Sequence, residues 1–462
     1  MILVNKKTLL LNFLSIIIYV FFMAINTFGL NLVQELILLL SSYVIFFLYC
    51  KKKLGSFKYL LSSPAFIYGT IFVPYVALAI VMFIIDGYVP RIYYYSFNKE
   101  TMVITTRFYI YIYLITLVLF SIFNLVKIID LKEEMLKKFN KVKVFFSSIN
   151  VIDIVAFVLA IYNFINVAKY GFSFFSLTTT QKRSITNNEI SHYANLMMVV
   201  YSLMISYYYI ARGNIKIRQK SNKKSLAFRL LICILYWGIF LTCERRIFTT
   251  FLIGLVILAS TNIKKIRMKY VVLILAVTSL LLVSASLRGN VTLKNSEPKN
   301  VLYMSLTEFY LTYSISNYYV YNIDNIDTIN GSSYFKATFL SLFPKFIATN
   351  KPKELAYQFY KNMKTNTGYS FNPVAEGILN YRYSAIIIVP ILISLVVLIA
   401  NLAVKFNFLG TIIIMIYSLD FYRGQFSNFF FDCVYCFVFL FLIFNINYVS
   451  TRKKGYKNAS DK

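Results

Sequence analysis

Long apolar runs recur along this chain and are separated by short polar segments. A helix needs about 20 mostly apolar residues to cross the hydrocarbon core of a bilayer. The runs predict an all-α polytopic membrane protein with about twelve transmembrane helices. The expected helices lie near residues 9–26, 33–50, 64–86, 107–127, 149–168, 192–211, 229–243, 247–262, 271–286, 383–404, 408–422 and 428–448.

Basic residues alternate along the chain in a way that predicts the orientation of these helices. Lys and Arg concentrate in the cytoplasmic loops of membrane proteins. Here they are frequent in every second connecting segment, which predicts that both termini are cytoplasmic. The expected cytoplasmic segments are 1–8, 51–63, 128–148, 212–228, 263–270, 405–407 and 449–462.

One segment is much longer than the other connections and is expected on the external side. It divides the chain into transmembrane helices 1–9 (residues 1–286), a large external loop (287–382), and transmembrane helices 10–12 with a cytoplasmic tail (383–462). Loops of this length are usually functional or disordered. Amphipathic pieces at 334–347 and 353–363 favour order and predict short helices along the outer surface.

Composition supports a membrane protein and excludes other classes. Hydrophobic residues make up 59% of the chain and charged residues 14%, whereas soluble domains average about 25% charged residues. The net charge of +30 is explained by Lys and Arg residues in the cytoplasmic loops. Membrane lipids are expected partners, and no nucleic-acid partner is expected. Cys433 and Cys436 lie inside an apolar run and are interpreted as packing residues, so no metal or other cofactor is expected.

Arginines at the expected outer membrane boundary are the first candidates for chemistry. Arg pairs with phosphate oxygens through two parallel hydrogen bonds and stays charged in any environment. A phosphate-bearing ligand at the outer leaflet is the functional interpretation, and contact with lipid headgroups is the alternative. The set comprises Arg245 and Arg246 in a tight turn, Arg288 after helix 9, Arg382 before helix 10, and Arg423 in a late turn.

An acidic residue lies just before the expected helix 10. Glu376 stands in the segment GYSFNPVAEGILNYRY, which spans residues 368–383. A carboxylate near several arginines keeps its charge and could accept a proton from a sugar hydroxyl. The alternative is an ion pair with Arg382 that orients the loop.

These segments resemble the external-loop signatures of oligosaccharide repeat-unit polymerases, the Wzy type of O-antigen and capsule polymerases. The segment with Glu376 is similar to their loop motif, with its turn, proline and Ala-Glu pair. Upstream, Pro344-Lys345 resembles a stretch in which a proline precedes a basic residue. The turns at residues 244–246 and 422–424 resemble the family's two basic turns, so the likeness covers roughly residues 230–430.

The resemblance implies a glycosyltransferase-C-like fold and a metal-independent glycosyltransferase in the bacterial cytoplasmic membrane. Its substrates would be undecaprenyl-pyrophosphate-linked oligosaccharides, and a flippase and a chain-length regulator would be its partners. Glu376, Glu308 and Arg288 are the expected catalytic residues. Arg245, Arg246, Arg382, Arg423 and Lys345 are the residues expected to bind pyrophosphate.

Three other functions remain open from the sequence, and one of them is a structural or assembly subunit without catalysis. A lipid-linked oligosaccharide flippase would also bind pyrophosphate, but it would carry its charges in a central cavity and would need no long external loop. A polysaccharide ligase would share most of the arginines and would be favoured by a histidine in that loop. The only histidine, His192, lies outside it. Asp324 and Asp327 suggest a metal site only weakly, because their spacing does not fit a DxD motif.

Overall fold

The computed structural model is helical in most of the residues that it describes, with no strand among them. Two compact units make up the chain, and each is described by itself. Unit 1 comprises residues 1–129, 302–402 and 417–432; unit 2 comprises 130–301, 403–416 and 433–462. The described residues are 31–55, 57–86, 99–127, 149–170, 189–214, 223–243, 254, 257, 298–343, 347–352, 355–356, 359 and 371–460.

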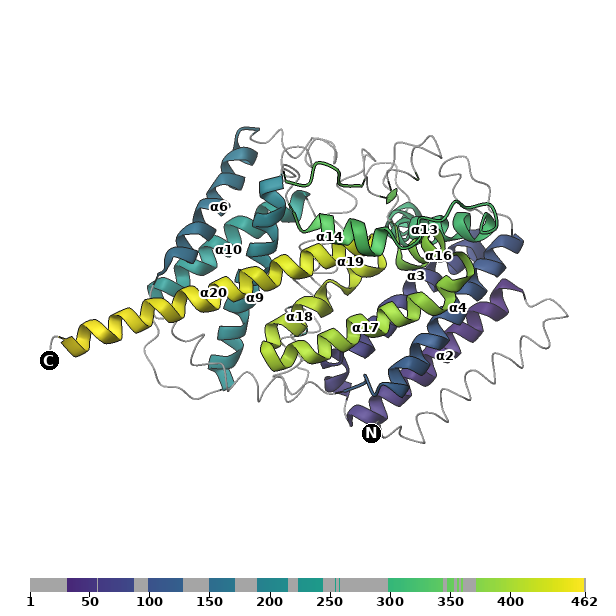
Figure 1. Ribbon diagram of the computed structural model, residues 1–462, viewed down its shortest axis with the longest axis horizontal. Helices are drawn as coiled ribbons and strands as arrows, with labels where there is room; N and C mark the ends of the chain where they lie inside the picture. The colour runs from purple at the N-terminus through teal and green to yellow at the C-terminus, as the bar shows by residue number, and fades with distance from the viewer. Residues whose placement is uncertain are drawn as a thin grey trace. The chain divides into compact units, whose positions relative to one another are not determined.

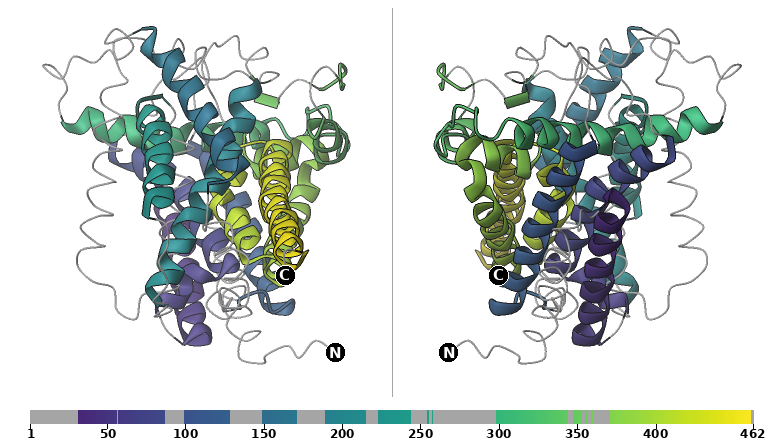
Figure 2. Two further views of the ribbon diagram at one scale, coloured as in Figure 1. Left: turned by 90° about the vertical axis from the view of Figure 1, so that its left-hand side faces the viewer. Right: turned by 90° about the vertical axis from the view of Figure 1, so that its right-hand side faces the viewer.

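Three long apolar helices form one part of unit 1: α2 (Leu32–Leu54), α3 (Pro64–Asp86) and α4 (Lys99–Ile122). Helix α2 packs on both α3 and α4, and Figures 1 and 2 show α2 and α3 side by side in purple. The start of α2 is capped by Asn31 and Gln34, whose side chains accept hydrogen bonds from each other's backbone N–H.

Helix α13 (Pro298–Tyr321) lies where the external loop is expected, and it is longer than the short surface helices foreseen for this segment. It packs against the first half of α4 through buried hydrogen bonds between side chains. Its apolar positions alternate with Thr, Ser and Asn, so its hydropathy is low and the sequence pattern did not mark it as a helix. Shorter helices follow: η3 (Ser333–Ala337), α14 (Thr338–Ser341) and α16 (Pro373–Tyr381).

The C-terminal helices are α17 (Ala385–Phe406), α18 (Phe408–Ile416), α19 (Ser418–Tyr422) and α20 (Phe426–Ser460). The 3-10 turn η4 (Arg382–Ser384) separates α16 from α17. The expected helix at 408–422 is divided at Tyr417, so that α18 belongs to unit 2 and α19 to unit 1. Helix α19 packs on α3.

Unit 2 includes α6 (Val151–Ala168), α9 (Glu189–Asn214) and α10 (Lys223–Cys243), with α18 against α9. A buried ion pair joins α6 to α10: the Arg229 Nε and Nη2 atoms lie 2.7 and 2.6 Å from the two oxygens of Asp153. Both side chains are fully buried. The Tyr201 hydroxyl of α9 donates to the same carboxylate at 2.8 Å. The Asp153 carboxylate therefore connects α6 to both α9 and α10.

The helical fold and the membrane character are confirmed, whereas the count of twelve spans is not. Every expected run within the described residues is helical in whole or in part. Five of the described helices are long and apolar enough to cross a membrane: Leu32–Leu54, Pro64–Val81, Glu100–Ile122, Pro373–Phe406 and Phe426–Phe444. The expected runs at 9–26 and 271–286, and most of 247–262, lie outside the described residues.

Breaking the Asp153–Arg229 pair should destabilise unit 2. In Arg229→Met the Asp153 carboxylate stays buried without its cation, so we expect the free energy of unfolding to fall by about 3–5 kcal/mol. The double variant Asp153→Asn, Arg229→Met removes both charges and keeps an acceptor for Tyr201, so it should recover much of the loss. Thermal unfolding of the purified protein in detergent measures both. Equal melting temperatures for the single variant and the wild type would contradict the expectation.

Candidate functional site

The described residues contain three of the predicted site side chains, all in unit 1. Glu376 is fully buried on α16, Arg382 is exposed at the end of that helix, and Arg423 is half-buried at the end of α19. Glu308 lies on α13, but its side chain is outside the description. The remaining candidates lie outside the described residues: Arg245, Arg246, Arg288 and Lys345.

Glu376 connects the loop motif to the late arginine turn. Its Oε2 atom accepts a hydrogen bond from the backbone N–H of Phe426, with an oxygen–nitrogen distance of 2.8 Å. Phe426 is the first residue of α20 and follows the turn at Arg423. One turn later on α16, the Asn380 side chain donates to Ser333 Oγ of η3 at 2.7 Å. The two segments that suggest a polymerase, 50 positions apart in sequence, are therefore neighbours in the fold.

Arg382 does not form the ion pair with Glu376 that the sequence left open. Its Nη2 atom donates to the carbonyl oxygen of Ile326 at 2.8 Å, and its backbone adopts φ 49°. This φ value is uncommon for a residue other than glycine. Close by, the Tyr383 hydroxyl donates to Asp324 at 3.0 Å. Arg382 and Tyr383 thus anchor the segment between α13 and η3, and Asp324 serves as an acceptor in that contact.

Aromatic rings surround the Glu376 region. The ring of Tyr334 stacks on Tyr381, with centroids 6.1 Å apart, and meets Phe426 edge-on at 5.7 Å. Burial raises the pKa of the Tyr334 hydroxyl well above its ordinary value, and the nearby Glu376 carboxyl raises it further. Tyr334 is therefore a neutral hydroxyl that can donate a hydrogen bond but cannot serve as a base near pH 7.

Tyr422, the residue before Arg423, is held by aromatic contacts with α3. Its ring lies 5.7 Å from Phe72, 6.0 Å from Tyr68 and 6.3 Å from Tyr75, measured between centroids. Aromatic pairs at these separations stabilise a fixed geometry beyond simple burial. The contacts fix the C-terminal end of α19 and hence the position of the backbone at Arg423.

Asn372 joins the loop motif to α13. Its side-chain oxygen accepts from the N–H groups of Val374 and Ala375, both at 2.9 Å, and so caps the start of α16. Its amide donates to the Thr312 carbonyl at 2.6 Å and to the Ser316 hydroxyl at 2.8 Å. The Asn-Pro pair of the motif is therefore a helix start in which the cap residue is also buried against a second helix.

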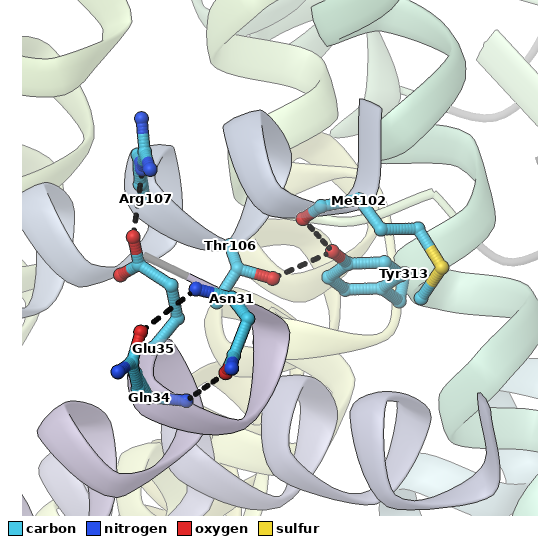
Figure 3. Close-up of polar contacts among 7 residues, drawn as sticks. All are labelled: Asn31, Gln34, Glu35, Met102, Thr106, Arg107 and Tyr313. Carbon is cyan, nitrogen blue, oxygen red and sulfur yellow. Dashed lines mark hydrogen bonds and ion pairs between the residues drawn. The ribbon is translucent and has the colours of Figure 1, made fainter. Parts of the chain in front are cut away.

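A chain of buried hydroxyl and amide contacts continues from Ser316 to α4. The Tyr109 hydroxyl lies 2.7 Å from Ser316 Oγ, and the Thr105 hydroxyl donates to Asn317 at 2.5 Å. One turn earlier on α13, the Tyr313 hydroxyl lies 2.9 Å from Thr106 Oγ1 and donates to the Met102 carbonyl (Figure 3). Hydrogen bonds between polar side chains in an apolar surrounding hold α4, α13 and α16 in one arrangement.

Sequence reasoning missed an ion pair at the edge of this network. Arg107 Nε donates to Glu35 Oε1 at 2.7 Å, joining α4 to α2 (Figure 3). The Glu35 side chain is fully buried and that of Arg107 is 25% exposed. A usable signal was present, because a charged residue within an apolar run is costly and is a functional candidate by default. Glu35 lies within the expected helix at 33–50, and Arg107 is the first residue of the expected helix at 107–127.

The weaker candidates lie elsewhere. His192, near the start of α9 in unit 2, is exposed. Cys433 and Cys436 are buried in α20. Within the described residues there is no cluster of three or more His, Cys, Asp or Glu side chains with the spacing of a metal site.

Comparison with known proteins does not identify a family for this chain. No protein-family model, no curated protein and no solved structure matches the chain.

Replacing Asn372 should weaken the site more than replacing an exposed cap of the same type. Asn372→Ala removes the cap of α16 and leaves buried polar groups of α13 without partners. We expect a loss of about 2 kcal/mol or more in the free energy of unfolding. Asn31→Ala, at the exposed cap of α2, is the matched control and should cost about 1 kcal/mol or less. Melting temperatures in detergent compare the two, and an equal effect would show that the buried contacts add nothing.

Proposed function

We propose that this chain polymerises undecaprenyl-pyrophosphate-linked oligosaccharide repeat units into a surface polysaccharide, O-antigen or capsule, at the outer face of the bacterial cytoplasmic membrane. One observation carries the proposal: the hydrogen bond from Phe426 N–H to Glu376 joins the acidic loop motif to the arginine turn. These are two of the segments that resemble the polymerases. Their proximity is what a shared active site requires, and the apolar helices supply the membrane setting.

The reaction fits the residue types. The C–O bond between the growing chain and its lipid pyrophosphate breaks, and a hydroxyl of the incoming repeat unit forms the new glycosidic bond. The hydroxyl proton passes to a base, and negative charge develops on the pyrophosphate. Preorganised cations at that position are the usual largest contribution to catalysis, and Arg423 is the described candidate. Arg245, Arg246, Arg288 and Lys345 belong to the same proposal on their sequence positions alone.

Two roles are proposed for Glu376, and the contacts support one of them more directly. A general base must reach the proton that it removes, within hydrogen-bond distance or through one water. Glu376 is fully buried and already accepts a backbone N–H next to the arginine turn. This supports a positioning role, in which its carboxyl holds the turn that presents Arg423. Glu308 then remains as the second candidate for the base.

A flippase for the same lipid-linked oligosaccharides is the alternative with an observation of its own. Two ion pairs, Glu35–Arg107 and Asp153–Arg229, lie in apolar helices of the two units. Ionisable residues within membrane helices are common along transport pathways. The polymerase is preferred because the acidic motif and the arginine turn meet in one place. A ligase would be favoured by a histidine in the external loop, and the one histidine of the sequence, His192, lies outside that loop.

Deletion of the gene separates these functions. Loss of a polymerase should leave lipid carriers with single repeat units that are exposed on the outer face and should abolish long chains. Loss of a flippase should leave the same carriers on the inner face. Gel profiles of surface polysaccharide, with enzymatic labelling of sugars on intact cells, measure both. Long chains that persist in the deletion strain would end the polymerase proposal.

The two roles of Glu376 give different mutant series. Glu376→Gln keeps an oxygen for the Phe426 N–H, so a positioning role predicts polymerisation within about tenfold of wild type, whereas Glu376→Ala should lose far more. A general base predicts that both variants lose about 100-fold or more. Initial rates of polymerisation by purified protein, at equal amounts of folded protein, distinguish the two. Full activity of Glu376→Ala would exclude both roles.

A further inference from the structure

The Glu35–Arg107 pair in unit 1 uses only part of its hydrogen-bonding capacity. Arg107 contacts Glu35 through Nε alone, at 2.7 Å. Figure 3 shows the remainder of the guanidinium group pointing away from the carboxylate. The two terminal nitrogens of Arg107 have no hydrogen-bond partner among the described residues, and neither has the buried Oε2 of Glu35. An arginine carries five N–H donors in a planar fork, so four remain for another group.

The Asp153–Arg229 pair of unit 2 shows what a purely structural arrangement looks like here. Asp153 binds Arg229 through both of its oxygens, both side chains are fully buried, and Tyr201 supplies a further donor. In the Glu35–Arg107 pair only the carboxylate is fully buried, and the cation is 25% exposed. A buried anion that orients a partly exposed cation is an arrangement suited to bind an external anion.

The position of the pair along the helices places it near the proposed chemistry. Glu35 lies in the first turn of α2, and three lysines lie in its last turn. By the positive-inside rule the lysine end is cytoplasmic, so Glu35 lies toward the external end. Arg107 lies in the half of α4 that contacts α13, and its neighbour Thr106 contacts Tyr313. The pair thus lies beside the contact between α4 and α13, whose hydrogen bonds continue through Ser316 to Asn372.

We propose that Arg107, oriented by Glu35, binds the phosphate of a lipid-linked ligand within the outer part of the membrane. The inference rests on the proposed function in naming the ligand as an isoprenoid pyrophosphate. The chemistry itself requires only a phosphate oxyanion, which a phospholipid headgroup also carries. Arginine pairs with phosphate through charge-assisted hydrogen bonds, which are stronger in a poorly solvated site. Glu35 is a positioning residue, because it acts only through the Arg107 guanidinium.

Lipid binding to purified full-length protein tests this site. The protein is placed in phosphatidylcholine nanodiscs, and undecaprenyl pyrophosphate is titrated in one series and phosphatidylglycerol in another. Arg107→Gln should weaken binding about tenfold or more, the loss of affinity expected for a charge-assisted contact. Lys52→Gln, exposed at the other end of α2, is the matched charge control and should bind like wild type. Native mass spectrometry measures the bound lipid.

Further variants separate binding from folding. Arg107→Gln leaves Glu35 buried without a cation, so the double variant Glu35→Gln, Arg107→Gln replaces the pair with two neutral side chains. It should melt close to wild type and still bind about tenfold more weakly or worse. Glu35→Gln alone keeps the cation but loosens its orientation, so it should bind between wild type and the double variant. A folded double variant with wild-type affinity for both lipids would overturn the proposal.

The two lipid series and the polymerisation assay distinguish the outcomes. Arg107-dependent binding of undecaprenyl pyrophosphate supports a substrate site, whereas dependence only for phosphatidylglycerol supports a phospholipid site and overturns the substrate assignment. Long chains that persist in the deletion strain remove the proposed function but leave these affinities unaffected. Normal polymerisation together with unchanged affinity in the folded double variant removes the Arg107 site alone.

Discussion

The hydrogen bonds of Asn372 are the constraint on which the rest of unit 1 depends. A buried amide must use its donors and acceptor, because an unpaired polar group in an apolar surrounding costs several kcal/mol. Asn372 meets this demand by capping α16 and by bonding to Thr312 and Ser316 of α13. Ser316 in turn contacts Tyr109 of α4. The residue that caps α16 therefore also fixes the position of α16 relative to α13 and α4. Glu376 follows one turn later on α16, so the start of the helix at Asn372 sets the orientation of its side chain.

The same demand explains the two ion pairs. Neither carboxylate could stay charged inside apolar helices without a cation, and each is paired with an arginine from another helix of its unit. In unit 2 the pairing uses both carboxylate oxygens, and both side chains are fully buried. In unit 1 it is incomplete, with one contact and a partly exposed guanidinium. Because the Asp153–Arg229 pair is fully buried, we assign it a role in stability. Because the Arg107 guanidinium is partly exposed, we assign the Glu35–Arg107 pair a role in ligand binding.

Glu376 illustrates how the structure changes the reasoning about a candidate. As a residue in a loop motif it was expected to meet substrate or to pair with Arg382. In the fold it is buried on a helix, Arg382 bonds to the Ile326 carbonyl instead, and the carboxyl receives the N–H of Phe426. Its closest functional link is therefore to the turn at Arg423. A residue can thus serve a site by fixing the backbone that carries the reacting groups.

The sequence by itself determined the class of the protein and most of its long helices, because apolar length is a local property that each segment carries alone. The runs at 33–50 and 64–86 match α2 and α3 closely, and 383–404 matches α17. Sequence also singled out Glu376 and Arg423. Only the tertiary structure decided that α13 is a long helix, that Glu35 and Arg107 form a pair, and that Glu376 and Phe426 meet. Glu35 and Arg107 are 72 positions apart in sequence, and Glu376 and Phe426 are 50 positions apart. Helix α13 depends on another helix for the hydrogen bonds of its polar side chains. The hydrophobic pattern of the sequence does not predict such contacts, because they form only when the helices pack together.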